Sequence, residues 1–214
     1  MFVLVEIGNP VACVPKETNN ESGHSRETIP VDSRGVNRYV FPVPGWSNAD
    51  YRKAFTEGHE RNKYVASLIS KEGLWAYCPP LKFAKNGEEI KSFTVHEKDV
   101  LTRAGTLEIK GQGRRFTWDV NQFPHPTQIV DTVESWEEKA IKPIAYVMVC
   151  NENMNCVVVP CSTRGRWRVE RRYDRYKKKD FDFYVADSGV IRPFSELLDF
   201  LRRKEAEWKE RSKP

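Results

Sequence analysis

Two short strand-forming runs meet at a turn in the stretch Lys98-Asp99-Val100-Leu101-Thr102-Arg103-Ala104-Gly105-Thr106-Leu107-Glu108-Ile109-Lys110. Because side chains alternate along a strand, Glu108 and Lys110 share one face, and the apolar residues beside them point to the other. If the two runs pair as a hairpin, Asp99 can lie across from Glu108 and Lys110. The stretch therefore predicts a strand pair on which two carboxylates and one ammonium converge.

The segment before this hairpin predicts a helix. Ser47 or Asn48 can cap its start, and Gly73 can end it. Apolar residues recur along it at helical spacing and form a stripe that should pack on a sheet. The members of this stripe are Tyr51, Phe55, Val65, Leu68 and Ile69.

Further strands and two more helices are expected after this helix. The strand-like runs share short lengths and are separated by Pro- or Gly-bearing turns or by polar segments. They cover residues 74–78, 98–102, 106–110, 115–120, 144–150, 156–160 and 181–186. A helix is expected over about 127–140, stopping before Pro143. The apolar spacing in 193–211 predicts a closing amphipathic helix.

This order of elements is typical of an α/β fold with a central mixed sheet flanked by helices. We expect one domain over residues 47–214, because a chain of 214 residues can bury one large core. Residues 1–46 are expected to form an N-terminal extension, an arm packed on that core. Within it, residues 15–38 are rich in Asn, Ser, Glu, Thr and Gly and lack apolar periodicity.

Composition points to a soluble intracellular protein, with 39% hydrophobic and 30% charged residues. Residues 1–14 are apolar but have no basic region, are interrupted by Glu6 and Pro10, and are too short to span a bilayer. We therefore expect no membrane partner. Five cysteines without a C-x-x-C pair predict neither a disulfide framework nor a zinc site, which favours reduced thiols in the cytoplasm.

The acidic and basic residues of the predicted hairpin suit phosphodiester hydrolysis. Asp99 and Glu108 can hold Mg²⁺ or Mn²⁺ through oxygen ligands, and such a metal polarises a phosphate and activates a bound water. Lys110 can orient that water or stabilise the charged transition state. The alternative is a half-exposed strand on which Asp99 and Lys110 form an ordinary surface ion pair.

Two glutamates of the first predicted helix lie near its apolar stripe. At about 100° per residue, Glu60 falls at the margin of the stripe and Glu57 falls inside that margin. A carboxylate that points toward a sheet needs a partner such as a metal, Lys110 or Arg61. A solvated glutamate that pairs with a neighbouring Lys or Arg on the helix fits the same spacing.

A family resemblance joins these features. The succession of Gly58-His59-Glu60, an apolar helix ending at Gly73, Asp99, and Leu107-Glu108-Ile109-Lys110-Gly111 resembles the PD-(D/E)XK superfamily, which includes restriction enzymes and archaeal Holliday-junction resolvases. The resemblance covers about residues 50–160 and implies an αβββαβ restriction-endonuclease-like core. Lys98 stands where the family name has Pro. The 24 residues from Leu74 to Glu97 predict an inserted hairpin or loop around residues 85–88.

The resemblance also implies roles for individual residues. Glu60 would be the helix carboxylate, with Glu57 as its substitute. Asp99 and Glu108 would join Glu60 as metal ligands, and Lys110 would be the catalytic lysine. Gln112 follows on the same strand face, where superfamily members sometimes hold a phosphate or water. A strand-end glutamine without a role is the alternative.

A basic segment over residues 164–179 holds the chain's excess positive charge. It carries nine Lys or Arg against two acidic residues, a balance of +7, so the rest of the chain sums to −2 out of a total of +5. Cations can neutralise phosphates, and aromatic rings can stack on bases. The nucleic-acid contacts expected here are Arg164, Arg166, Trp167, Arg168, Arg171, Arg172, Arg175, Lys177 and Lys178. A solvated strand edge is the alternative.

The sequence therefore predicts a Mg²⁺- or Mn²⁺-dependent nuclease, an endonuclease with DNA favoured over RNA as substrate. Three alternatives stay open. One is a non-catalytic DNA- or RNA-binding protein on a nuclease-like scaffold, and another is an RNA-processing nuclease with the same site. The third is a different enzyme in which Asp99 and Glu108 do general acid and base work. A homodimer stays open as the assembly state.

Overall fold

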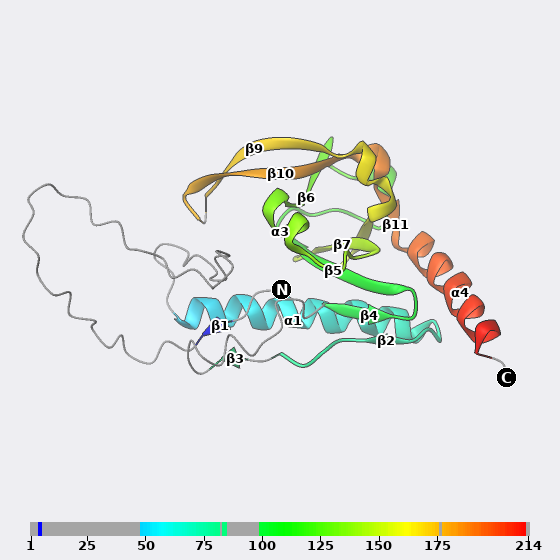
Figure 1. The fold of residues 1–214 in the computed structure, drawn as a ribbon. Helices are drawn as coiled ribbons and strands as arrows, with labels where there is room; N and C mark the ends of the chain where they lie inside the picture. The colour runs from blue at the N-terminus through cyan, green and yellow to red at the C-terminus, as the bar shows by residue number, and fades with distance from the viewer. Residues whose placement is uncertain (1–3, 6–47, 82, 85–98, 176, 213–214) are drawn as a thin grey trace, which may run out of the picture.

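A computed structural model describes residues 4–5, 48–81, 83–84, 99–175 and 177–212 (Figure 1). Apart from Leu4–Val5, the expected arm over 1–46 lies outside these residues, as does the expected insertion around 85–88. The elements in chain order are β1 (Leu4–Val5), α1 (Asn48–Lys71), β2 (Ala76–Tyr77), β3 (Phe83–Ala84), β4 (Val100–Thr102), β5 (Gly105–Gln112), η1 (Val120–Gln122), β6 (Thr127–Thr132), α3 (Val133–Glu138), β7 (Ala145–Cys150), β8 (Cys156–Pro160), η2 (Cys161–Arg166), β9 (Arg168–Asp174), β10 (Lys179–Asp187), η3 (Ser188–Val190), β11 (Arg192–Pro193) and α4 (Phe194–Arg211).

The main sheet is mixed, as the sequence predicts, and runs in the order β11-β8-β7-β5-β4-β2. β5 and β7 are parallel, and the other neighbours in this sheet are antiparallel. The predicted hairpin is confirmed, because β4 pairs with β5 from Val100 opposite Leu107 to Thr102 opposite Gly105. The strands predicted over 144–150 and 156–160 are β7 and β8, and the helix predicted over 193–211 is α4.

Both faces of the main sheet are buried, which explains why all six residues of β7 are apolar and buried. One face packs on the apolar stripe of α1, where Val65 and Ile69 join Leu107 and Ile109 in a single core. The other face packs beneath α3 and the second sheet, in a cluster that contains Trp136. α1 ends before Gly73, whose φ of 72° is a conformation that glycine adopts without strain.

The helix predicted over 127–140 is wrong in its first half. Residues Thr127–Thr132 form β6, which pairs with β10 in a separate three-stranded sheet of order β6-β10-β9. The helix α3 begins at Val133, because the hydroxyl of Thr132 caps it by accepting a hydrogen bond from the backbone N–H of Ser135. The central mixed sheet expected from the sequence is therefore accompanied by a second, three-stranded sheet.

The strand predicted over 115–120 is absent. Phe116 is buried at 3% exposure, but its carbonyl accepts hydrogen bonds from the side-chain amides of Asn153 and Asn155 instead of a neighbouring strand. The segment is thus a loop held by side chains of the β7–β8 turn. No helix in the described ranges has the length and apolar content that a membrane span requires.

We expect Gly105→Ala to lower the free energy of unfolding by about 1–3 kcal/mol. Gly105 closes the β4–β5 turn with a φ of 137°, and a Cβ there would lie 2.8 Å from Cγ2 of Ile144. Gly165→Ala is the matched control, because a Cβ at Gly165 meets no atom within 4 Å. Urea unfolding of both variants measures the difference, and equal stability would contradict the steric argument.

Candidate active site

The strand alternation that places Glu108 and Lys110 on one face is confirmed. In the parallel pair of β5 and β7, Glu108 lies opposite Tyr146, and Lys110 lies opposite Met148. Tyr146 and Met148 belong to the core on the side of α3, whereas Ile109 packs toward α1. The Glu-x-Lys side chains therefore point toward β6 and α3.

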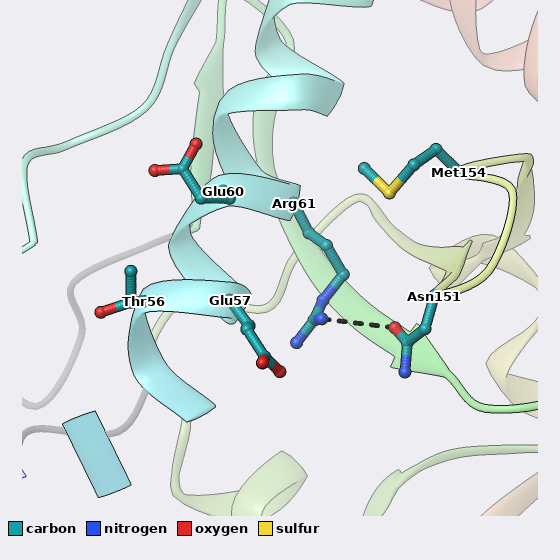
Figure 2. A pocket seen from close by; sticks show the side chains of 6 residues that line it. All are labelled: Thr56, Glu57, Glu60, Arg61, Asn151 and Met154. Carbon is teal, nitrogen blue, oxygen red and sulfur yellow. Dashed lines mark hydrogen bonds between the residues drawn. The ribbon is translucent and has the colours of Figure 1, made fainter. Parts of the chain in front are cut away.

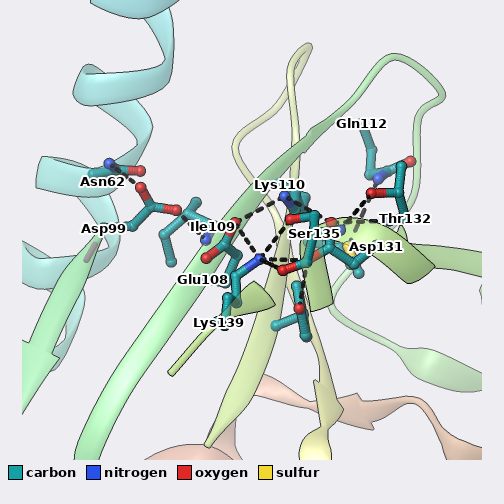
Figure 3. Close-up of polar contacts among 12 residues, drawn as sticks. Asn62, Asp99, Glu108, Ile109, Lys110, Gln112, Asp131, Thr132, Ser135 and Lys139 are labelled. Atoms are coloured by element: carbon teal, nitrogen blue, oxygen red, sulfur yellow. Dashed lines mark hydrogen bonds and ion pairs between the residues drawn. The ribbon is translucent and has the colours of Figure 1, made fainter. Parts of the chain in front are cut away.

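On that face the two side chains enter a network of hydrogen bonds and ion pairs (Figure 3). Lys110 Nζ lies 2.8 Å from Glu108 Oε1 and 3.8 Å from Asp131 Oδ1. Lys139 Nζ lies 2.6 Å from Asp131 Oδ2, which also accepts a 2.7 Å hydrogen bond from the hydroxyl of Tyr146. Two carboxylates thus face two ammonium groups, a balance that offsets the cost of burying them.

The network fixes the protonation states of Glu108 and Lys110. Burial by itself would raise the pKa of Glu108, but the charge of Lys110 and, more weakly, that of Lys139 act against it, and the pKa is lowered from the ordinary value. Burial opposes the charge of Lys110, but Glu108 and Asp131 raise its pKa above the ordinary value. At neutral pH Glu108 is therefore ionised, and Lys110 is a fixed cation and not a base.

Asp99 lies at the edge of β5 instead of on the face of Glu108, which corrects the predicted placement (Figure 3). Its Oδ2 accepts a 2.7 Å hydrogen bond from the backbone N–H of Ile109, beyond the last residue of β5 that pairs with β4. Its Oδ1 accepts a 3.1 Å hydrogen bond from Asn62 on α1. Asp99 thus ends the β4–β5 ladder on the side of α1.

Asp99 and Glu108 have different partners, but their charges interact. Burial, and then the charge of Glu108, raise the pKa of Asp99 above the ordinary value. Among the described residues, no group of three or more His, Cys, Asp or Glu is arranged to hold a metal ion.

Glu60 does not join this pair, so its expected orientation toward the sheet is wrong. Its side chain is 61% exposed and lies 2.8 Å from Nζ of Lys63, one helical turn further on. The hydrogen bond from Lys63 lowers the pKa of Glu60, as expected of a solvated helical pair. Glu57 is also exposed. The α1 residue that reaches Asp99 is Asn62, because it points to the sheet at this level of the helix.

A depression of about 360 Å³ lies beside α1, between that helix and the β7–β8 turn (Figure 2). Its lining consists of Thr56, Glu57, Glu60, Arg61, Asn151 and Met154. Arg61 donates a 3.3 Å hydrogen bond to the side-chain oxygen of Asn151. A Cβ at Gly111 would lie 2.9 Å from the guanidinium carbon, so the absence of a side chain there lets Arg61 approach β5. Burial lowers the pKa of Arg61, while Glu57 and Asp99 oppose that change.

Trp167 lies in the core, so its predicted stacking on bases is wrong. It is 6% exposed, and its indole N–H donates a 2.9 Å hydrogen bond to the hydroxyl of Thr163. Its ring lies 5.2 Å from that of Trp136, centroid to centroid. Trp167 therefore holds the start of β9 on the sheet and is inaccessible to a nucleic acid.

Several arginines of the 164–179 segment already have acidic or aromatic partners. Arg168 binds Glu170 and Asp187, and Arg172 also binds Glu170, at 2.8 Å. The remaining contacts are Arg171 with Asp182 at 3.5 Å, Arg164 over the ring of Tyr184 at 3.7 Å, and Lys177 over the ring of Phe181 at 4.9 Å. The segment is thus less free to attract phosphates than its charge suggests, and the nucleic-acid contacts predicted for its Arg and Lys residues stay a prediction.

Gln112 occupies the end of β5, where its carbonyl accepts a hydrogen bond from the backbone N–H of Asn151. Its side-chain amide lies 3.6 Å from the sulfur of Met148. These contacts place Gln112 beside the network without a bond to Glu108 or Lys110. They favour the alternative of a strand-end residue.

Four residues of the site lie outside the Glu-x-Lys motif and were not predicted from the sequence: Asn62, Asp131, Lys139 and Tyr146. Asp131 and Lys139 fell within one predicted helix, whereas the structure places them on β6 and just after α3. The sequence did contain a signal for a strand over 127–132, because the β-branched residues around Asp131 favour a strand. Asn62 gives no signal by itself, since its role depends on where Asp99 lies.

Comparison with known proteins identifies no relative of this chain. No protein-family model matches the chain, and no curated protein or solved structure shows significant similarity to it. The resemblance of the motifs to the PD-(D/E)XK superfamily therefore stays an expectation.

We expect Asp99→Asn to raise the free energy of unfolding at neutral pH by an amount on the order of 1 kcal/mol. The raised pKa means that the fold disfavours the ionised carboxylate, whereas the amide oxygen still accepts a hydrogen bond from Ile109. The gain should vanish as pH falls below the ordinary pKa of aspartate, where both states are protonated. Urea unfolding in EDTA across this pH range measures it.

The matched control is Asp199→Asn, which removes an exposed carboxylate paired with Arg202 on α4. That variant should change stability by less than about 0.5 kcal/mol. An Asp99→Asn protein less stable than the wild type would show that the Asp99 carboxylate stabilises the fold.

Proposed function

We propose that this protein hydrolyses phosphodiester bonds of nucleic acid, DNA before RNA, with Mg²⁺ or Mn²⁺ held by Asp99 and Glu108. The observation that carries the proposal is the pair itself. Asp99 lies just before β4 and accepts a hydrogen bond from the backbone N–H of Ile109, the residue after Glu108, and the charge of Glu108 raises the pKa of Asp99. A divalent cation would relieve the repulsion between these two carboxylates, which supports the proposal.

The residues of the network would have different roles in hydrolysis. When bound, the metal ion would polarise the phosphate and activate water. Lys110 is protonated and 27% exposed, so it can stabilise negative charge that develops on the phosphate. Asp131 and Lys139 are positioning residues, because Asp131 faces Lys110 and Lys139 faces Glu108, and both are less exposed than Lys110.

The order of elements supports the likeness to the PD-(D/E)XK core. With the short β2 and β3 set aside, α1, β4, β5, β6, α3 and β7 follow one another as helix, three strands, helix and strand. β6 departs from that core, because it pairs with β10 and not with the main sheet. The likeness therefore rests on β4, β5 and α1, which position the acidic pair.

Arg61 is the cation best placed to receive a phosphate near this pair. It lies in the depression beside α1, interacts with the charge of Asp99, and forms no ion pair with a described carboxylate. The planar guanidinium can bind two phosphate oxygens at once. Arg61 would therefore make one of the phosphate contacts that the sequence predicts for the 164–179 segment.

A binding protein on a nuclease-like scaffold is the second candidate. It is favoured by the closed network, in which Glu108 and Lys110 already neutralise each other, and by Glu60, which points away from Asp99 and Glu108. Such a protein would bind nucleic acid and cut none. Cleavage assays separate the two candidates.

We expect Glu108→Gln to reduce metal-dependent cleavage by at least about 100-fold, because it removes a charged metal ligand. Glu60→Gln is the matched control on α1 and should keep wild-type turnover, since its carboxylate is solvated. The assay uses plasmid, linear and branched DNA and single-stranded RNA with Mg²⁺, Mn²⁺ or EDTA. Binding of the same substrates should persist in Glu108→Gln.

Two outcomes would contradict these assignments. Equal loss of turnover in Glu60→Gln would mean that the helix carboxylate reaches the metal after all. Absence of cleavage by the wild type with every metal and substrate, together with binding, would favour the scaffold candidate.

We expect Arg61→Ala to weaken binding of duplex DNA and to flatten the slope of log K against log salt by about 0.9, the value for one phosphate contact. Arg202→Ala on α4 is the matched control, because Arg202 is paired with Glu72 and Asp199. Fluorescence anisotropy over a range of salt concentrations measures both slopes. An unchanged slope for Arg61→Ala would exclude a phosphate contact at this residue.

A further inference from the structure

β9 is the outer strand of the three-stranded sheet and lies at the upper edge of the molecule in Figure 1. It is seven residues long and pairs with β10 on one side. Among the described residues no strand pairs with its other side. An exposed strand edge offers backbone N–H and C=O groups to another strand.

The sequence of β9 is complementary to itself. It reads Arg168-Val169-Glu170-Arg171-Arg172-Tyr173-Asp174. When two copies run antiparallel with Arg171 at the centre, each residue faces the one equally far from Arg171 on the other copy. The facing pairs are Arg168 with Asp174, Val169 with Tyr173, and Glu170 with Arg172. Opposite charges thus meet at four places, and apolar side chains meet at two.

The exposure of the β9 side chains fits this pairing. Val169 and Tyr173 share one face of the strand and are 55% and 60% exposed, so neither is covered by its own chain. Facing each other across two strands, they would form the aromatic and β-branched pairs that stabilise sheets. The central pair joins two arginines, and each has Asp182 of its own chain 3.5 Å away to reduce the repulsion.

We propose that β9 pairs antiparallel with β9 of a second copy of this chain, around a twofold axis at Arg171. The two three-stranded sheets then become one continuous sheet of six strands. A second copy is the partner because the complementarity is with the strand's own sequence. A nucleic acid fits this edge less well, because Glu170 and Asp174 alternate with the arginines on one face and would repel phosphates.

Two charge reversals test the pairing. In Glu170→Arg, two arginines face each other on both sides of the axis, and in Arg172→Glu, two glutamates do. Each variant of the full-length chain should therefore self-associate about tenfold more weakly than the wild type or worse. An equal mixture of the two variants restores opposite charges at every facing pair and should return to near wild-type association. Sedimentation velocity over a concentration series measures all four samples.

The mixture separates pairing from folding. Each reversal also disturbs contacts inside its own chain, because Glu170 bonds Arg168 and Arg172 there. A folding defect would persist in the mixture, whereas a facing charge would be compensated. Tyr173→Ser provides a second route, since it removes an exposed ring and should also weaken the dimer. Ile141→Ser, which alters a residue 59% exposed outside β9, should leave the dimer intact.

Three results would each overturn the proposal. The first is a wild-type chain that stays monomeric at every concentration reached. The second is a Glu170→Arg or Tyr173→Ser variant that dimerises as well as the wild type. The third is a mixture of the two charge variants that associates no better than either variant alone.

Discussion

The Asp131 carboxylate is the contact on which the arrangement of the two sheets depends. It belongs to β6 in the three-stranded sheet, yet it accepts a hydrogen bond from Tyr146 on β7 and faces Lys110 on β5, both in the main sheet. Lys139 supplies the balancing charge. A buried ion pair gives little net stability against apolar packing, but loss of one member leaves an uncompensated charge. The network therefore selects one relative placement of the sheets more than it strengthens the fold.

This division explains why the acidic side chains of the candidate site behave differently. Glu108 lies within the balanced network and stays ionised because two ammonium groups surround it. Asp99 lies outside the network, held by an amide side chain and a backbone N–H, and neither donor carries a full charge. The protein thus keeps one carboxylate satisfied and leaves the other short of positive charge, a feature more often found at functional sites than in structural ion pairs.

The sequence predicted the parts of the fold that depend on local pattern. Alternation placed Glu108 and Lys110 on one face, and apolar runs located β7 and β8. Residues 127–140 were misassigned because Val130, Val133 and Trp136 recur at near-helical spacing, although strand pairing with β10 decides the first half. Glu60 pairs with Lys63 one helical turn away, which the helical spacing allowed as well as an orientation toward the sheet. The burial of Trp167 depends on neighbours distant in sequence, such as Trp136, and cannot be read from spacing.

Gly111 has a consequence for hydration as well as for space. Because it carries no side chain, the guanidinium of Arg61 comes into contact with β5, and water is excluded from that side of the cation. A guanidinium is more weakly hydrated than an ammonium to begin with. Part of the dehydration that an incoming anion would require has thus taken place during folding, and under the proposed function this would lower the cost of binding a phosphate at Arg61.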